Sequence, residues 1–361
     1  MTRPFSRRQW KTFAAGMRFS VVVGAAFGAL AGGKVLKPPL LGAAMGALGS
    51  VVYAIIFMTL LGGGEIFLPR TRLGQALGRA PFVAVVAVKF AVYLAVVVAV
   101  IGAKLGPRVA LLAVDAESAR LMMEQVGSNM PRGLVVSVMA MVMFFMILLR
   151  QAQLLIGERN FRDIGLGRYR RPRTEERFFL FVDIVGSTPV AERLGPLAVH
   201  RYLDRIFQLA SDPIDDHGGD VYQYVGDEIV VTWTVPEGRG EARPLACFFA
   251  IEAALASAAP DFEREFGTVP TLRAALHAGE VVTGEIGGSR RAIVFHGDVM
   301  NTTSRIENAT RDLGRSFLVS EDALRRVEGA EDYVLEDLGP LQLRGRQAAM
   351  RVYAATPVRQ L

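Results

Sequence analysis

The sequence predicts two domains of different class: an N-terminal all-α transmembrane bundle of four helices and a C-terminal α+β domain with a ferredoxin-like order of strands and helices. The 361 residues are 51% hydrophobic, which is high for a wholly soluble protein. Long apolar blocks lie in the first 150 residues, whereas short strands and helices alternate from about residue 174. We therefore expect a transmembrane domain at 1–150, a cytoplasmic linker at 151–173 and the second domain at 174–361.

Charge divides between the same two parts of the chain. Residues 1–150 carry 16 Lys and Arg against 4 Asp and Glu, whereas residues 151–361 carry 25 against 31. The net charge of +6 therefore comes from the first part, where basic residues flank apolar blocks. Because the second domain is acidic, we expect no nucleic-acid partner.

Four apolar blocks each approach the roughly 20 residues that a membrane-spanning helix needs. Arg18 lies near one end of the first block, where its side chain can reach the interface. Lys89 lies inside the third block and is expected either to pair with a polar group inside the bundle or to take part in function. The blocks occupy residues 13–33, 39–62, 81–103 and 132–149.

Basic residues precede the first block and follow the second and fourth blocks. In a four-span bundle these three places lie on the same side of the membrane. By the positive-inside rule that side is cytoplasmic, so both termini are predicted to be cytoplasmic. A basic start before an apolar block is also typical of a cleaved signal peptide, and three remaining spans still leave the second domain inside. The flanking residues are Arg3, Arg7, Arg8, Lys11, Arg70, Arg72, Arg79, Arg150, Arg159, Arg162, Arg168, Arg170, Arg171 and Arg173.

The second domain is expected to contain a strand, a helix, a hairpin of two strands, a second helix and a further strand. This order is the split βαβ, ferredoxin-like arrangement, in which the first strand and the hairpin lie side by side. The elements are placed at 177–184, 189–219, 220–234, 243–267 and 271–287.

An aspartate ends the first of these strands. The apolar run Phe178–Val182 is followed by Asp183, and a buried ionised carboxylate is costly unless it is paired or holds a metal. Asp227 occupies the tip of the neighbouring hairpin and is expected to lie beside Asp183. Two carboxylates there repel each other unless divalent cations bridge them.

A glycine-containing turn follows Asp183 directly. The backbone N–H groups of Gly186, Ser187 and Thr188 can point toward phosphate oxygens. Paired carboxylates beside a phosphate cradle indicate two-metal phosphoryl or nucleotidyl chemistry. The single Cys247 and four His without metal-site spacing leave carboxylates as ligands, which suits Mg²⁺ or Mn²⁺.

Four motifs occur in order, FVDIVGST, YQYVGDEIVV, VFHGDVMNTTSR and LQLRGRQAAMRVYA. Together they resemble the catalytic domain of class III adenylate/guanylate cyclases over roughly residues 174–357. The resemblance implies a nucleotide cyclase that converts ATP into 3′,5′-cyclic AMP and pyrophosphate. It also implies a bacterial enzyme of the inner (plasma) membrane, anchored in the lipid bilayer by its first half.

The resemblance assigns a metal site and a catalytic pair. Asp183, Asp227 and the carbonyl of Ile184 match the ligands of two Mg²⁺ or Mn²⁺ ions per active site. Asn301 and Arg305 match a ribose-orienting asparagine and an arginine that stabilises the transition state. These two residues are one helical turn apart and share a helix face.

Substrate contacts follow from the same resemblance. Gly186, Ser187 and Thr188 fall in the phosphate-contacting turn, and Arg344 or Arg346 stands where the family has a basic residue for the terminal phosphates. The metal ligands and the Asn/Arg pair come from opposite subunits in this family, which implies a homodimer with two equivalent sites.

Two departures from the family pattern concern the base. Gln223 stands where adenine-selecting members carry Lys, and Val294 stands where Asp, Thr or Ser commonly contacts the base. Gln223 can donate and accept hydrogen bonds, whereas Val294 offers only packing. The guanine-type Glu is absent at 223, so ATP is favoured and GTP is the alternative substrate.

Other interpretations remain open at this point. A guanylate cyclase differs only in its base, and a non-catalytic membrane receptor could bind nucleotide through a degenerate cyclase domain. The turn around Asp227 also resembles the diguanylate-cyclase GGDEF turn, a family in which the later NTTSR segment has no role. The linker is either a basic tether to anionic lipid or a relay from an unidentified membrane ligand or partner.

Overall fold

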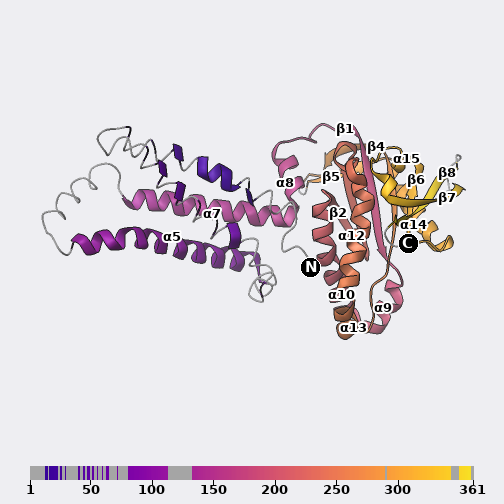
Figure 1. Ribbon diagram of the computed structural model, residues 1–361, viewed down its shortest axis with the longest axis horizontal. Coiled ribbons are helices and arrows are strands. Elements are labelled where there is room, and N and C mark those ends of the chain that lie inside the picture. The colour runs from indigo at the N-terminus through magenta and orange to yellow at the C-terminus, as the bar shows by residue number, and fades with distance from the viewer. Residues whose placement is uncertain are drawn as a thin grey trace. The chain divides into compact units, whose positions relative to one another are not determined.

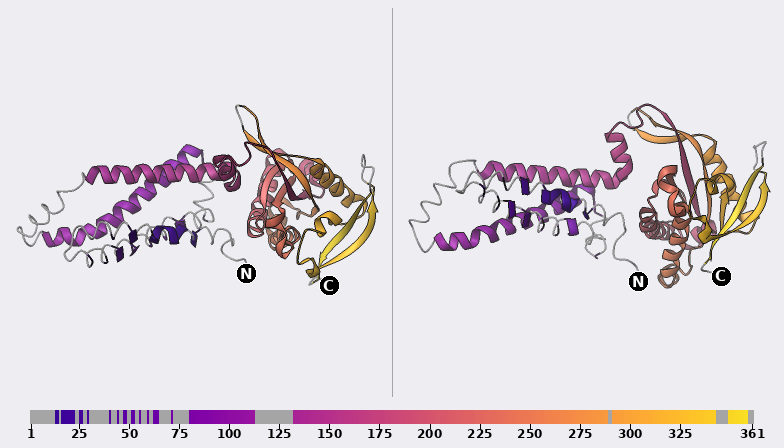
Figure 2. Two further views of the ribbon diagram at one scale, coloured as in Figure 1. Left: turned by 90° about the horizontal axis from the view of Figure 1, so that it is seen from above. Right: turned by 45° about the horizontal axis from the view of Figure 1, so that its top comes forward.

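The computed structural model describes residues 80–112, 132–288, 291–342 and 349–358, with scattered positions between 13 and 71. The chain divides into two compact units, one of residues 9–161 and one that contains residues 162–361. Figures 1 and 2 show the helical character of the first unit and the mixed sheet and helices of the second.

Two long helices make up most of the part of the first unit that the structure describes. These are α5 (Phe82–Leu112) and α7 (Arg132–Ile156), which correspond to the third and fourth predicted apolar blocks. Phe90 of α5 and Phe144 of α7 meet edge to face with ring centroids 5.8 Å apart. Lys89 lies in α5 and is 9% exposed. The first and second predicted blocks lie largely outside the described residues.

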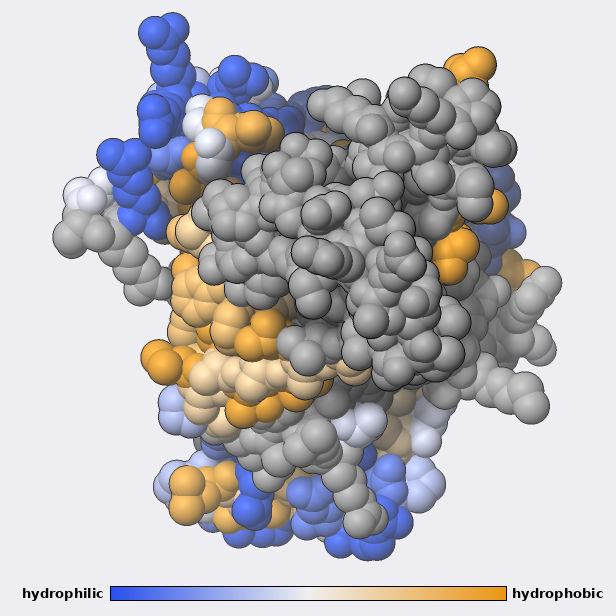
Figure 3. Space-filling model, turned by 90° about the vertical axis from the view of Figure 1, so that its left-hand side faces the viewer, coloured by the Kyte–Doolittle hydropathy of each residue, from blue (hydrophilic) through white to orange (hydrophobic). Residues whose placement is uncertain are grey.

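Large apolar side chains are exposed on both helices. Figure 3, which faces this unit, shows hydrophobic residues gathered on its described surface. Helices that are apolar on several faces are typical of burial in a core or a membrane. The exposed residues are Phe82, Val83, Val88, Val92, Met141, Phe144, Phe145, Met146, Leu149, Leu154, Leu155 and Ile156.

Within the described residues, no single helix has both the length and the hydropathy of a membrane span. Phe82–Val96 and Met143–Ile156 are apolar but shorter than a span. Two helices of the second unit, Gly240–Ser257 and Ala259–Phe266, reach those limits only as a pair bent by 57°. The four-helix transmembrane bundle therefore stays a prediction.

The second unit is built on one sheet with strand order β2-β3-β1-β4-β6-β8-β7, and β5 pairs with β4 outside this path. β1 pairs antiparallel with both β3 and β4, which confirms the ferredoxin-like core. The strands are β1 (Arg173–Ile184), β2 (Asp220–Val225), β3 (Glu228–Thr234), β4 (Leu272–Ile286), β5 (Ala292–His296), β6 (Phe317–Ser320), β7 (Tyr333–Leu341) and β8 (Met350–Pro357).

Helices flank this sheet and precede it. α8 precedes β1 along the chain, and α14 packs against β4 and β1. The bounds are α8 (Glu158–Gly165), α9 (Ser187–Leu194), α10 (Pro196–Asp216), α11 (Val235–Gly238), α12 (Arg243–Ser257), α13 (Ala259–Phe266), α14 (Asp298–Asp312) and α15 (Glu321–Leu324), with short 3₁₀ turns at Gly240–Ala242 and Ala330–Asp332.

Each predicted helix of this domain is in fact two helices, so the single-helix interpretations of 189–219 and 243–267 were wrong. Gly195 adopts φ 76° between α9 and α10, and Pro196 begins α10. Positive φ suits glycine and interrupts a right-handed helix. The second break lies at Ala258, just before the proline in the first turn of α13, which cannot continue the backbone hydrogen bonding.

Alternation along β1 separates two apolar layers. Phe178, Leu180 and Val182 belong to the larger core, which includes residues of α10, α12 and α13. Phe179 and Phe181 face the other way and pack with Val299 of α14 and Phe295 of β5. We call these two sides the core face and the α14 face of the sheet.

Gly279 of β4 lets α14 approach the sheet closely. A Cβ atom built at Gly279 would lie 2.8 Å from Cγ2 of Val299. That separation is shorter than any normal carbon–carbon contact, so a side chain at this position must push the helix away. The close contact matters for function because α14 carries Asn301 and Arg305.

We therefore expect Gly279→Ala to destabilise the protein by about 1–3 kcal/mol. The measurement is thermal unfolding of the full-length protein in detergent, followed by the fluorescence of buried Trp233. Gly288→Ala, with open space around its Cβ position, is the matched control. Adding Val299→Ala should recover part of the loss, and equal stability of both alanine variants would contradict the packing argument.

Candidate active site

Asp183 lies on the α14 face at the end of β1. It is 8% exposed and stands directly opposite Arg273 of β4 in the antiparallel ladder. A guanidinium nitrogen of Arg273 forms an ion pair with Oδ2 of Asp183. The buried carboxylate predicted from the sequence therefore has a partner, and the partner is a cation of the same protein.

Asp227 reaches Asp183 from the turn between β2 and β3. Val225 pairs with Glu228, so Gly226 and Asp227 form a two-residue loop. Gly226 has φ 64°, which a type II′ hairpin turn requires at its first loop position. Because β3 lies next to β1, the loop ends beside the end of β1. The structure thus brings the two predicted metal-binding aspartates together.

Asp183 is electrostatically linked to Asp227, and a hydrogen bond joins the two carboxyl groups. Burial raises the pKa of Asp183 to about 6, and repulsion from Asp227 and a hydrogen bond between the two carboxyl groups add to the effect. The positive charge of Arg273 opposes this shift in the pKa of Asp183. Burial likewise raises the pKa of Glu228 to about 7, followed by repulsion from Glu307, Asp183 and Asp227.

Sequence reasoning missed three residues of this cluster. Nε of Arg273 donates to Oε1 of Glu307 on α14 at 2.5 Å, and Glu307 is 5% exposed. Arg273 therefore connects the end of β1 to α14. Glu228 could have been found, since it follows Asp227 directly. Arg273 and Glu307 lie outside the four motifs, and their contacts depend on strand register and helix rotation.

The oxygen ligands fit a hard divalent cation. Among the described residues no group of three or more His, Cys, Asp and Glu side chains is arranged to hold a metal ion. Asp183 and Asp227 nevertheless form a close pair whose repulsion a cation would remove. A Mg²⁺ ion held by these two carboxylates and by the Ile184 carbonyl that the resemblance implies would keep further positions for other oxygen ligands.

The predicted phosphate turn starts a helix. Gly186 precedes α9 with φ 69°, and Ser187 and Thr188 are its first residues. The N–H group of Val185 donates a hydrogen bond to the carbonyl oxygen of Thr271 at 2.9 Å. The first N–H groups of a helix have no partner within it and attract anions.

The two predicted base positions lie on different strands. Gln223 is exposed on β2 and pairs with Val230 of β3. Val294 is half-buried on β5 and pairs with Gly284 of β4. Strand alternation puts the Val294 side chain on the opposite face of β5 from Phe295. Gln223 pairs with Val230 and so shares the α14 face with Asp183.

Asn301 and Arg305 lie on the outer side of α14. Asn301 is exposed and Arg305 is half-buried, whereas Ile306 and Glu307 are buried against the sheet. The helix therefore presents Glu307 to its own sheet and the predicted catalytic pair away from it. Arg344 and Arg346 lie outside the described residues.

Residues 170–356 match the family described as adenylate and guanylate cyclase catalytic domain. The match covers more than half of the chain, and the protein belongs to this family. The resemblance seen in the four sequence motifs is therefore confirmed.

Curated relatives carry the name adenylate cyclase. The chain is 40% identical over 202 residues to adenylate cyclase 2 of Rhizobium meliloti (strain 1021), and the alignment covers 56% of each protein. It is 30% identical over 172 residues to an adenylate cyclase of Mycobacterium tuberculosis (strain ATCC 25618 / H37Rv), covering 48% of this chain and 38% of that one. The matched part thus spans about half or less of these relatives.

A solved structure shares the fold. The structure of a bacterial light-regulated adenylyl cyclase aligns with a TM-score of 0.52 at 20% identity, covering 64% of this chain and 67% of that chain. At this identity the likeness supports the architecture of the domain alone.

The paired aspartates predict a stability that depends on pH. The raised pKa of Asp183 means that its ionisation destabilises the metal-free fold as pH rises from about 4 through about 6. Asp227→Asn removes the repulsion that Asp227 exerts on the ionised Asp183 carboxylate. In EDTA at pH 7–8 we expect the variant to be more stable than the natural protein by about 1 kcal/mol, or roughly 2–4 °C.

Thermal unfolding across pH 4–8 measures this difference. The difference in melting temperature between the two proteins should close toward pH 4, where Asp183 is protonated in both. Glu265→Gln, which neutralises an exposed carboxylate on α13, serves as the control and should leave stability within about 0.5 kcal/mol. A variant less stable than the natural protein at pH 8 would show that the aspartates do not repel each other.

Proposed function

We propose that this protein is a membrane-anchored adenylate cyclase that converts ATP into 3′,5′-cyclic AMP and pyrophosphate. The observation that carries the proposal is the Asp183–Asp227 pair beside the N-terminus of α9, on the sheet face that also carries α14. Family membership and the adenylate cyclases among its relatives support the same chemistry.

Two divalent cations, Mg²⁺ or Mn²⁺, would be held by Asp183, Asp227 and the Ile184 carbonyl, and would acidify the ribose 3′-hydroxyl and neutralise the triphosphate. The ribose 3′-hydroxyl gives up its proton to solvent, its oxygen attacks the α-phosphorus, and the bond from that phosphorus to the bridging oxygen breaks to release pyrophosphate. Arg273 keeps Asp183 and Glu307 close together by offsetting their negative charge.

The protein's own groups bind and orient the nucleotide. The N–H groups of residues 186–188 at the start of α9 bind phosphate oxygens. Asn301 orients the ribose, and Arg305 stabilises the charge that develops on the α-phosphate. Arg344 or Arg346 supplies positive charge to the terminal phosphates.

The outward direction of the catalytic pair supports a homodimer with shared sites. Asn301 and Arg305 lie on the side of α14 away from the sheet that carries Asp183. A two-fold axis can place the α14 of one subunit against the metal site of the other. Each dimer then has two equivalent sites.

Base selection is assigned chiefly to Gln223, with Val294 providing packing beside the base. An amide side chain can pair with either purine, so the absence of a carboxylate at position 223 favours ATP without a charged contact. GTP is the alternative substrate. A non-catalytic nucleotide receptor is disfavoured because Asp183, Asp227, Asn301 and Arg305 are all present.

The first unit is proposed to anchor the enzyme in a bacterial inner membrane with both termini in the cytoplasm. The exposed apolar side chains of α5 and α7 and the basic residues around the predicted spans support this placement. The linker would then lie next to anionic lipid.

Cyclic-nucleotide formation by the detergent-solubilised full-length protein tests the activity, with ATP and GTP in parallel and with Mg²⁺ or Mn²⁺. Cyclic AMP should dominate. Asp227→Ala should reduce turnover by at least about 10³-fold because it removes a charge that holds the cation. Full activity of a folded Asp227→Ala protein would rule out the metal assignment.

Complementation tests the shared sites. Asp183→Ala and Arg305→Ala should each be inactive alone. Co-expressed in equal amounts, half of the dimers contain one of each chain and therefore one intact site, so activity should return to roughly a quarter of the natural level. Asp183→Ala mixed with Asp227→Ala is the control and should stay inactive, since both lesions affect the same half-site. No recovery in the first mixture would contradict sites built from two subunits.

A further inference from the structure

β2 carries a β-bulge next to the candidate base-reading residue. In the described ladder Val221 pairs with Val231 and Gln223 pairs with Val230, which leaves Tyr222 as the extra residue. Val221 packs on the core face, whereas Tyr222 and Val230 belong to the α14 face. Because directly paired residues point the same way, Gln223 shares the face of Val230. The bulge therefore puts Tyr222 and Gln223, adjacent in sequence, on one face.

Tyr222 rests on Phe295 of β5. The ring centroids are 4.8 Å apart with an interplanar angle of 59°. Burial raises the pKa of the Tyr222 hydroxyl, and a backbone hydrogen bond with Phe295 offsets part of that rise. In the sheet pairings β2 joins β3 and β5 joins β4. The Tyr222–Phe295 contact thus ties together two strands that share no described ladder.

Phe295 is held on two further sides. Phe179 of β1 meets it edge to face at 5.4 Å. The guanidinium carbon of Arg177, also on β1, lies 4.7 Å from the centre of the Phe295 ring. A desolvated cation over an aromatic face contributes more than an exposed one, and Arg177 is 3% exposed.

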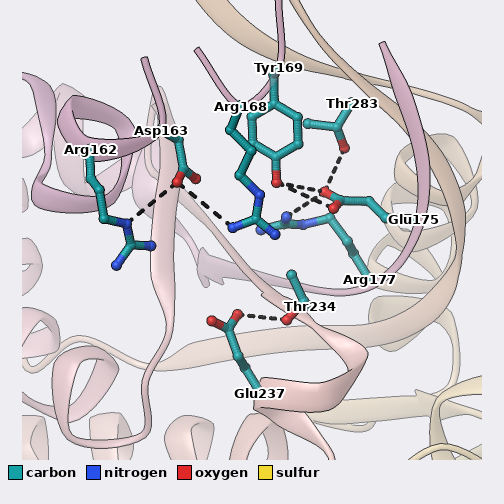
Figure 4. Close-up of polar contacts among 9 residues, drawn as sticks. All are labelled: Arg162, Asp163, Arg168, Tyr169, Glu175, Arg177, Thr234, Glu237 and Thr283. Carbon is teal, nitrogen blue, oxygen red and sulfur yellow. Dashed lines mark hydrogen bonds and ion pairs between the residues drawn. The ribbon is translucent and has the colours of Figure 1, made fainter. Parts of the chain in front are cut away.

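Arg177 in turn has a fixed orientation. Its Nη1 donates to Oε1 of Glu175 at 2.7 Å and its Nε donates to the hydroxyl of Thr232 at 3.1 Å. Glu175 also accepts hydrogen bonds from the hydroxyl groups of Tyr169 at 3.2 Å and Thr283 at 2.8 Å. Figure 4 shows Tyr169, Arg177 and Thr283 converging on this carboxylate. Burial alone would raise the pKa of Glu175, but these donors lower it, so Glu175 stays ionised.

We propose that Tyr222, Phe295 and Arg177 are positioning residues that determine base selectivity. Together they hold the bulge of β2 and thereby set where Gln223 meets the purine edge, without contacting the nucleotide themselves. The inference rests on the proposed function, in which Gln223 reads the base.

The position of this cluster predicts an effect on selectivity rather than on chemistry. Asp183 and Asp227 lie at the other end of β1 and in the β2–β3 turn. Neither the Asp183–Arg273 ion pair nor the hydrogen bond between the two aspartates involves any of these three residues. Loss of the Phe295 ring frees Tyr222 and lets Gln223 move. Hydrogen-bond recognition is sensitive to such shifts, since a displacement of about 1 Å can cost up to two orders of magnitude.

The decisive variant is Phe295→Leu in the full-length protein, because leucine keeps the site apolar but removes the ring. We expect the KM for ATP to rise roughly tenfold and the ATP-to-GTP ratio of kcat/KM to move toward one by a similar factor, with kcat within about threefold. Tyr222→Leu should behave alike, whereas Tyr222→Phe, which keeps the ring, should retain most of the selectivity. Arg177→Lys should shift the ratio in the same direction by a smaller factor.

Phe249→Leu is the matched control. Phe249 of α12 stacks on Tyr333 of β7 at 5.5 Å, so this variant loses an aromatic pair of similar kind outside the base site. It should lower the melting temperature and leave the ATP-to-GTP ratio unchanged. An unchanged ratio in Phe295→Leu, or an equal change in Phe249→Leu, overturns the inference.

Binding of fluorescent ATP and GTP analogues separates the inference from the proposed activity. If the natural protein binds both analogues but forms no cyclic nucleotide, the proposed activity fails, and the ratio of the two Kd values in Phe295→Leu still decides the inference. A change in that ratio supports it and an unchanged ratio overturns it. A natural protein that binds neither analogue overturns both.

Discussion

The active site depends on keeping two like charges close together at one edge of a sheet. Asp183 lies at the end of β1 and Asp227 in the β2–β3 turn, and the antiparallel pairing of β1 with β3 brings them within hydrogen-bonding reach. Burial makes their repulsion costly. Arg273 lies on β4, the other neighbour of β1, and its positive charge offsets the repulsion. The same arginine binds Glu307, so the position of α14 is linked to the charge balance of the aspartates.

That link makes α14 a helix with two roles. Its inner side joins the acidic cluster through Glu307, and its outer side carries Asn301 and Arg305. The absence of a side chain at Gly279 allows the helix to lie close enough to the sheet for the inner contact. In a dimer with shared sites, the ion pair of one site and the arginine of the other would then move as parts of one rigid element.

The sequence alone predicted those features of the site that depend on local patterns. Asp183 ends an apolar run and Asp227 occupies a glycine turn, so both could be placed before the structure was known. Arg273 could not, because its contact with Asp183 depends on the register between strands about 90 residues apart in the chain. The division of each long helix into two was also missed, since apolar periodicity continues across Gly195 although the backbone does not.

The bulge in β2 has a consequence for how such a site can change during evolution. Gln223 faces the same way as Val230 because the two residues pair, so the face on which it appears is set by the register of β2 and not by the identity of residue 223. Point substitutions at position 223 can alter the chemistry presented to a base but leave its direction intact. Deletion of Tyr222, the extra residue of the bulge, would restore a regular ladder and keep Gln223 opposite Val230, so the strand can lose its bulge without turning this side chain away from the α14 face.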